Sequence, residues 1–456
     1  MSDESNRFSR RVQRYASVGT NVGGAAAKLA ASRLFGMDVN NQRNAQDLAQ
    51  ALGGLKGPLM KVAQLLSTIP EALPPEYAAE LSQLQADAPP MGRAFVRRRM
   101  AAELGTGWRS QFATFEQDAT ASASLGQVHR ATLHDGEKIA CKLQYPDMES
   151  AVEADLNQLK VLFAIHRQMD AAVDTTEILK EIGARVREEL DYTREASHMA
   201  LYGQIFEGHP LIRVPEIVED HSTKRLLTMT WLQGTRLLDY KDSSLEIRNR
   251  LTEALFKAWW YPFSNYGVIH GDPHLGNYTV FEEDGEPGGI NLLDYGCIRI
   301  FPPGFVKGVI DLYHGLDRGD NDLIASAYER WGFRNLSRDL MDVLNSWAAF
   351  IYGPLLDNRV RTVADGISPG EYGRKQAFHV HQQLKEKGPV TIPREFVFMD
   401  RAAIGLGGVF LHMQAELNFY ALFNETIERF DEKTVTSVQS AAFQSVGLTP
   451  PEMAAA

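Results

Sequence analysis

Apolar residues along this chain follow two different spacings. Up to about residue 110 they recur at helical intervals, and the segment PEALPPEYAAELSQLQADAPP predicts a helix between proline stops. Over residues 121–146 the pattern becomes strand-like, because two short runs of β-forming residues flank HDGE, which is typical of a hairpin built around Asp-Gly. Helical spacing returns over residues 149–206, for example at Ile178, Ile182 and Val186.

The second half of the chain is mainly helical. The segment RLLTMTWLQG predicts a strand that ends in glycine, and two later segments, VIHGDPHLGNYTV and GGINLLDYGCIRIF, interrupt the helical pattern. A small strand-rich lobe followed by a larger helical lobe predicts an α+β fold with the two-lobed layout of a protein kinase. The division we expect is a helical N-terminal extension over 1–110, a kinase-like N-lobe over 111–235 and a helical C-lobe over 236–456.

Composition narrows the classes of protein that fit this pattern. With 456 residues, 44% hydrophobic and 23% charged, the chain can bury a large core. The net charge of -11, without a long basic run after residue 100, argues against a nucleic-acid partner. Two cysteines provide neither a disulfide framework nor zinc-ligand spacing, which favours a reducing, cytoplasmic location. No apolar run reaches the roughly 18 residues that predict a transmembrane helix.

The strongest chemical signal is the order of three polar residues in the second half of the chain. In HGDPHLGN, Asp272 and Asn277 are five residues apart, as in a kinase catalytic loop, where the aspartate orients the attacking hydroxyl and the asparagine holds a metal. Asp294 follows an apolar strand in NLLDYG, where a carboxylate can bind Mg²⁺. Each segment alone also suits a turn, so the prediction depends on their combination.

Two upstream residues fit the same reaction. Lys142, in the strand EKIACKLQYP, stands where kinases keep the lysine that contacts the phosphates of ATP. Glu195 in EELDYTREASHM is the candidate glutamate that pairs with this lysine. Trp231 and Leu232 fit the hinge between the lobes, where backbone groups contact adenine, and a core strand is the equal alternative.

Two features depart from an ordinary protein kinase. The phosphate loop should be rich in glycine, yet it reads ATASASLGQVH, and side chains crowd it at Ala121, Ser122, Ala123 and Ser124. Far upstream, Lys61 and Gln64 are three residues apart in a predicted helix and therefore lie on one face.

Together these motifs resemble the UbiB family of atypical kinases, which is associated with ubiquinone biosynthesis. The family has a Lys-x-Gly-Gln helix, an alanine-rich loop in place of the glycine-rich one, and a Glu-x-Asp motif. Here MKVAQLLS aligns with the first motif, with Ala63 in place of its glycine, and ELD matches the third at Glu189 and Asp191. ASASLGQVH aligns with the loop, with Ser122 departing from it. The similarity covers roughly residues 50–300.

The resemblance implies an N-terminal helix folded over the active site. Lys61 and Gln64 would engage Glu189 and Asp191, and charge-assisted hydrogen bonds would pin the helix where a peptide would otherwise bind. The expected activity is then Mg²⁺-dependent ATP hydrolysis, or phosphorylation of a small or lipid-like molecule such as a quinone precursor. The resemblance also implies that Asn277 and Asp294 hold the metal and that the loop from Ala121 to Ser124 grips the phosphates.

Other functions also fit the sequence. A small-molecule phosphotransferase of the aminoglycoside or choline kinase type also uses an HGD loop, but it lacks the Lys61 and Gln64 helix. A scaffold that binds ATP without useful turnover would use the same residues as a slow ATPase. The N-terminal arginines could place an amphipathic helix on the inner face of a membrane, or the segment could be a leader that runs into a packed helix.

Overall fold

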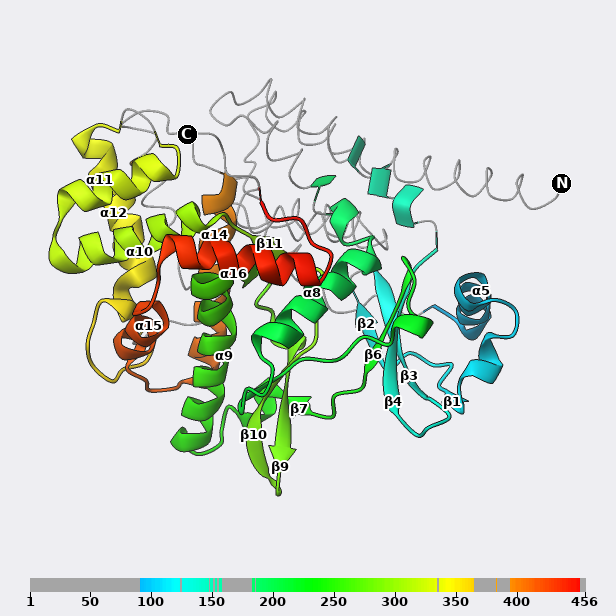
Figure 1. The fold of residues 1–456 in the computed structure, drawn as a ribbon. Helices are drawn as coiled ribbons and strands as arrows, with labels where there is room; N and C mark the ends of the chain where they lie inside the picture. The colour runs from blue at the N-terminus through cyan, green and yellow to red at the C-terminus, as the bar shows by residue number, and fades with distance from the viewer. Residues whose placement is uncertain are drawn as a thin grey trace, which may run out of the picture. The chain divides into compact units, whose positions relative to one another are not determined.

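The structure is a computed structural model that describes residues 91–123, 125–146, 148–150, 152–153, 156–157, 183–184, 186–333, 336–364, 383 and 394–451. These residues fall into two compact units (Figure 1). The first contains the described residues up to Tyr192 together with Glu219–Thr228, and the second contains Thr193–Val218 and the described residues from Met229 onward. Most of the predicted N-terminal extension lies outside the described residues, and the three-part division of the chain stays a prediction.

The first unit is built on an antiparallel sheet. Its strands run in the order β1-β3-β4-β6, with β2 paired to β3. β6 continues into the second unit. Its elements are α5 (Arg93–Leu104), η1 (Trp108–Gln111), β1 (Thr114–Phe115), β2 (Ala121–Ala123), β3 (Gly126–Thr132), β4 (Lys138–Gln144), η2 (Glu219–His221) and β6 (Leu226–Thr230).

The β3–β4 hairpin confirms the turn predicted from HDGE. Gly136 has φ 93°, a left-handed conformation that glycine adopts without steric cost. Leu133 N donates to the Glu137 carbonyl at 2.9 Å, and Asp135 Oδ1 accepts from Glu137 N at 2.9 Å. The turn sets the register that pairs Lys142 of β4 with Val128 of β3.

Arg99 of α5 fixes the far end of β4. Its guanidinium is 9% exposed and donates to the carbonyls of Gln144 and Tyr145 at 3.2 and 3.1 Å. Glu103, one turn later on α5, pairs with Arg99 at 3.2 Å and with Arg225 at 3.1 Å. Because the Arg99 and Glu103 side chains are both largely buried, loss of Glu103 would leave the Arg99 charge uncompensated. The strand that carries Lys142 is thereby held at both ends.

The second unit combines many helices with two small sheets. One sheet has the order β5-β10-β9-β7, in which β5 and β10 are parallel, and the other pairs β8 with β11. Its strands are β5 (Ile212–Arg213), β7 (Thr235–Arg236), β8 (Val268–His270), β9 (Tyr278–Glu283), β10 (Glu286–Leu292) and β11 (Ile298–Ile300). Its helices are α8 (Tyr192–Ile205), η3 (Leu237–Tyr240), α9 (Leu245–Tyr266), η4 (Leu275–Asn277), α10 (Pro303–Arg318), α11 (Asn321–Arg330), α12 (Arg338–Tyr352), η5 (Gly353–Leu355), α14 (Arg394–Met413), α15 (Phe419–Ile427) and α16 (Glu432–Ser445).

Helix α9 is central to this unit and packs against α15 and α16 (Figure 1). Ser244 caps its start by accepting a hydrogen bond from Ile247 N. Its buried face is aromatic: the Trp260 ring meets Trp259 edge-on at 4.8 Å and Phe423 of α15 at 4.7 Å between centroids. Large buried rings supply most of the apolar area in such a core. The helix ends one residue before β8, so its packing fixes where that strand begins.

The junction between α9 and β8 is closed by the C-terminal helix. Gln439 of α16 is 2% exposed and donates from Nε2 to the carbonyls of Tyr266 and Phe301 at 2.7 and 2.9 Å. Gly267 lies between these groups in the left-handed region with φ 65°. A Cβ at Gly267 would lie 2.5 Å from both Gln439 Nε2 and the Phe301 carbonyl oxygen.

We expect Gly267→Ala to lower the free energy of unfolding by more than about 2 kcal/mol, because it adds a steric clash to the backbone strain. Gly319→Ala is the matched control. Gly319 also ends a helix with φ 68°, but a Cβ there meets nothing within 4 Å, so only the strain of about 1 kcal/mol applies. Urea denaturation of both variants measures the difference. Equal losses would contradict the close packing at Gly267.

Candidate active site

The HGDPHLGN loop (His270–Asn277) is folded on itself by short hydrogen bonds. It begins at the last residue of β8 and ends in the 3₁₀ turn η4. The Asp272 carbonyl accepts from His274 N at 2.7 Å and from Asn277 Nδ2 at 2.9 Å. Leu293 N donates to the Asn277 carbonyl at 3.1 Å. The side chains of Asp272 and Asn277 are therefore held on one small loop, and this loop is tied to the residue that precedes Asp294.

His270 joins this loop to the DYG segment (Asp294–Gly296). Its imidazole is buried, and Nε2 donates to the Asp294 carbonyl at 2.7 Å while Nδ1 accepts from Asp272 N at 3.3 Å. A carbonyl oxygen can only accept, so Nε2 carries the proton and the neutral tautomer satisfies both contacts. His270 therefore orients the two aspartates.

Both aspartates lie close to one buried phenol. Burial raises the pKa of Tyr278 well above its ordinary value, and the negative charges of Asp272 and Asp294 raise that pKa further. The phenol stays neutral at physiological pH, so it adds no negative charge beside the two carboxylates. The antiparallel β9–β10 hairpin, with Tyr278 opposite Leu292, brings the two segments together.

Glu195 reaches the same place from α8. It stands in the first turn of that helix and is 4% exposed. A Cβ on Gly296 would lie 3.5 Å from Asp294 Oδ1 and 3.6 Å from Glu195 Oε2, so the two carboxylates flank this glycine. Burial raises the pKa of Tyr295, and the charges of Asp294 and Glu195 act in the same direction. The second unit thus brings together four predicted residues: Glu195, Asp272, Asn277 and Asp294.

The predicted strand lysine and the predicted phosphate loop belong to the first unit. Lys142 is half-buried on β4, with its Nζ 5.2 Å from the centre of the Tyr192 ring. Ala121, Ser122 and Ala123 form β2, a strand paired to β3, and its first two residues are exposed. The predicted pairing of Lys142 with Glu195 joins residues of different units and stays a prediction.

The Glu-x-Asp motif forms the turn that leads into α8. Glu189 is 8% exposed, and the carbonyl of Leu190 accepts from Gln144 Nε2 at 2.9 Å, so the turn is attached to the end of β4. Asp191 N donates to the Glu188 carbonyl at 3.1 Å. The other predicted residues of this group, Lys61, Gln64 and Ser124, lie outside the described residues.

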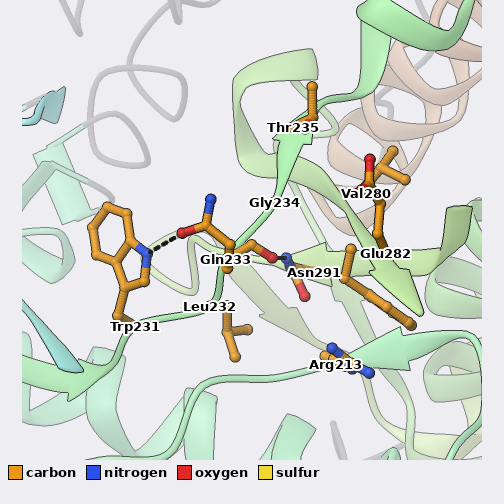
Figure 2. Close-up of a pocket in the computed structure, with 10 residues that line it drawn as sticks. Arg213, Trp231, Leu232, Gln233, Gly234, Thr235, Val280, Glu282 and Asn291 are labelled. Atoms are coloured by element: carbon orange, nitrogen blue, oxygen red, sulfur yellow. Dashed lines mark hydrogen bonds between the residues drawn. The ribbon is translucent and has the colours of Figure 1, made fainter. Parts of the chain in front are cut away.

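A cavity of about 430 Å³ borders the predicted hinge in the second unit (Figure 2). Trp231 and Leu232 line it and follow the end of β6, so the core-strand alternative for these two residues is wrong. Asn291 Nδ2 donates to the Gln233 carbonyl at 3.1 Å and to Thr279 Oγ1 at 3.0 Å. Within the described part of the chain, its buried Oδ1 has no hydrogen-bond partner. The sequence motifs do not include Asn291, although its place as a lone polar residue in the apolar run GGINLL was a signal.

Gln127 and His129 support β3 near the phosphate loop. The Gln127 carboxamide accepts from Met91 N at 2.7 Å and donates to His129 Nε2 at 2.8 Å, while His129 Nδ1 donates to the Glu116 carbonyl at 2.9 Å. Burial lowers the pKa of His129, which agrees with a neutral ring that accepts at Nε2. Both residues are buried and have structural roles.

The second unit offers oxygen donors that fit Mg²⁺ bound together with phosphates. The Asp294 carboxylate and the Asn277 carboxamide are on segments that the Leu293 N bond joins, and Mg²⁺ prefers one or two such ligands with the rest from phosphates and water. No group of three or more His, Cys, Asp or Glu side chains suited to a metal is found where the structure is described.

Among the helices that the structure describes, none has the length and apolar character needed to cross a bilayer.

Comparisons with known proteins agree on the atypical kinases of the ABC1 type. The model of the ABC1 atypical kinase-like domain matches residues 83–328. The mitochondrial atypical kinase COQ8 of Saccharomyces cerevisiae is 28% identical over 264 residues, which are 58% of this chain and 52% of that protein. The chloroplastic protein Activity of BC1 Complex Kinase 8 of Arabidopsis thaliana is 29% identical over 299 residues, or 64% of this chain and 39% of that protein. The chain thus spans about half or less of the length of these two relatives.

A solved structure is similar to most of the chain. It is the complex of Rv3197 with erythromycin from Mycobacterium tuberculosis, with a TM-score of 0.57 and 26% identity over 89% of this chain and 97% of that one. Together with the match to a kinase-like domain, it confirms the predicted kinase-like α+β fold.

The two cysteines next to predicted site residues should be chemically inert. Burial raises the pKa of Cys141 to about 12, although a hydrogen bond from Thr228 opposes this shift. A free thiol ionises near pH 8.5, so the folded protein should show no gain in Cys141 labelling by iodoacetamide between about pH 7 and 10. Mass spectrometry of labelled peptides measures this. The urea-unfolded protein is the control, and rapid labelling of Cys141 in the folded chain would contradict its burial.

Proposed function

The chain belongs to the ABC1 atypical kinase-like family, and on that basis we propose that it binds Mg²⁺–ATP and acts as an atypical kinase or ATPase that supports ubiquinone biosynthesis. The resemblance found in its motifs is thereby confirmed at the level of the family. The proposed reaction is ATP hydrolysis, or phosphorylation of a small or lipid-like molecule, rather than phosphorylation of proteins.

The observation that carries this proposal is the position of His270 between the two acidic segments. Its imidazole bonds to the backbone of Asp272 on one side and to that of Asp294 on the other. Phosphoryl transfer depends mainly on positioning and on stabilising charge, so two carboxylates held by one buried ring suit it. Asp272 would accept a hydrogen bond from the attacking hydroxyl or water and orient it. Asn277 and Asp294 would hold the metal.

When bound, Mg²⁺ would neutralise charge that develops on the phosphate oxygens. Lys142 and the loop from Ala121 to Ser124 would hold the phosphates, and Glu195 would orient Lys142. Trp231 and Leu232 would contact the base, and the neighbouring cavity supports an open surface at this position. The neutral phenols of Tyr278 and Tyr295 suit such a site because they add no negative charge near the phosphates.

A small-molecule acceptor is the class that we favour. Lys61 and Gln64 would pin the N-terminal helix to Glu189 and Asp191, which would exclude a peptide. The solved relative that holds erythromycin supports a ligand that is not a peptide. We propose a lipid or quinone precursor as this ligand, with the protein in the cytoplasm or peripheral on the inner face of a membrane. An ATP-gated scaffold is the second candidate, because binding without turnover would use the same residues.

We expect Asp294→Asn to lower Mg²⁺-dependent ATP hydrolysis by at least about 100-fold, because the carboxylate that would hold the metal loses its charge. Phosphate release by the purified chain, with and without anionic liposomes, measures the rate. Asp242→Asn is the matched control, since the Asp242 side chain is 88% exposed. Unchanged hydrolysis in Asp294→Asn would contradict the proposed metal role. Absence of hydrolysis in the unmodified chain, with ATP still raising its Tm, would favour the scaffold.

The occluding helix has its own test. The double variant Lys61→Ala, Gln64→Ala should gain phosphorylation of a bulky substrate such as casein, because the proposed hydrogen bonds to Glu189 and Asp191 would be lost. Transfer of labelled phosphate to casein measures the gain. Lys56→Ala removes a nearby lysine and should stay inactive toward casein. If the double variant hydrolyses ATP but still leaves casein unmodified, the helix does not exclude proteins.

A further inference from the structure

Helix α8 presents one buried face to the DYG segment. Glu195, His198 and Tyr202 follow one another at intervals of three and four, so they share a side of the helix. Their exposed fractions are 4%, 2% and 0%. Glu195 approaches Gly296, and the Tyr202 ring meets the Tyr295 ring edge-on at 5.5 Å between centroids. His198, between them on the helix, makes a polar contact with the same segment.

That contact is a hydrogen bond to the carbonyl of Tyr295, the residue after Asp294. His198 Nδ1 lies 3.2 Å from the Tyr295 carbonyl oxygen, and both residues are buried. The carbonyl can only accept, so Nδ1 must be the protonated nitrogen. The preceding carbonyl, that of Asp294, accepts from His270 Nε2 at 2.7 Å. Two successive carbonyls of the DYG segment are thus held by two histidines from different elements, α8 and β8.

Two further bonds brace the segment internally. Tyr295 Oη donates to the Leu292 carbonyl at 2.9 Å, and Gly296 N donates to Asp294 Oδ1 at 3.3 Å. These two bonds set the local conformation of the DYG segment. The bonds of His270 set the distance of this segment from the HGDPHLGN loop. Of these four hydrogen bonds to the DYG segment, only the bond from His198 comes from α8, the helix that also carries Glu195.

We propose that His198 is a positioning residue that fixes the Tyr295 peptide, and through it the Asp294 carboxylate, relative to α8 and Glu195. Rotation of this peptide would turn the backbone next to Asp294 and move its carboxylate, and small displacements of a reacting group lower rates strongly. The fixing of the segment is a property of the protein alone. Its consequence for Mg²⁺–ATP rests on the proposed function.

Three variants separate the hydrogen bond from packing. His198→Leu fills most of the volume of the histidine side chain but has no hydrogen-bond donor. If the leucine variant does not fold, His198→Met takes its place in the experiment. His198→Asn restores an N–H donor near the position of Nδ1. Tyr202→Phe is the control on the same face. It keeps the ring contact with Tyr295 and removes a buried hydroxyl that lacks a hydrogen-bond partner among the described residues.

Two measurements on the full chain decide the proposal. Hydrogen exchange of peptides covering residues 292–298, without ligand, should be faster in His198→Leu and close to wild type in His198→Asn and Tyr202→Phe. In thermal shifts with ATP, the Mg²⁺ concentration for half-maximal stabilisation should rise about tenfold in His198→Leu, as expected for loss of one buried hydrogen bond. The turnover number kcat should fall with little change in KM for ATP, and His198→Asn should restore it.

The outcomes distinguish this proposal from the proposed function. Wild-type exchange and Mg²⁺ dependence in His198→Leu would overturn the role of His198. If the leucine and asparagine variants lose exchange protection and Mg²⁺ affinity equally, the effect comes from packing, and the proposed role of the His198 hydrogen bond is overturned as well. If the wild-type chain neither binds nor hydrolyses ATP, the proposed function fails, while the exchange measurement still decides whether His198 fixes the segment.

Discussion

The arrangement of the second unit depends on the imidazole of His270. This ring connects the loop that carries Asp272 with the segment that carries Asp294, beside the backbone bond from Leu293 N to the Asn277 carbonyl, and it makes both of its bonds as a neutral tautomer. Its own backbone is held in turn, because Trp259 Nε1 donates to the His270 carbonyl at 3.1 Å. The acidic groups are thus positioned by a buried residue of the core, which limits their motion more than a surface loop could.

The surrounding fold is organised to keep this connection in place. β8 and β11 pair directly, so the strand before the HGDPHLGN loop and the strand after the DYG segment move together. The buried carboxamide of Gln439 then donates to the carbonyls of Tyr266, the last residue of α9, and Phe301, the residue after β11. Satisfying buried carbonyls in this way is a general requirement, and here it also attaches α16 to the backbone that flanks β8 and β11.

The electrostatic setting is unusual for the number of acidic groups that it contains. Glu195 and Asp294 approach the same glycine, and burial together with these charges raises the pKa of Tyr295 well above its ordinary value. The phenol of Tyr278 is kept neutral in the same way by burial and by Asp272 and Asp294. The proposed Mg²⁺ site relies on the oxygen ligands of Asn277 and Asp294, which are of the kind that this ion prefers.

The amino-acid sequence by itself determined the features that depend on short-range patterns. The hairpin around Asp135 and Gly136 follows from turn chemistry, and the order of Asp272, Asn277 and Asp294 identified the candidate site because these residues lie within a few dozen positions. The kinase-like α+β class followed from the change between strand and helix spacing. Such signals are readable because they are set by backbone geometry over one or two elements.

Tertiary structure alone decided the contacts between distant residues. His198 and Tyr295 are separated by 97 positions, and Asn291 and Gln233 by 58, yet each pair shares a hydrogen bond, buried in the first pair and partly buried in the second. In the sequence nothing distinguishes His198 from other helical residues. Only the packing of α8 shows that it faces the Tyr295 carbonyl. The physical reason is that such pairs are selected by how whole elements pack, since a buried polar group must find its partner wherever the fold brings one.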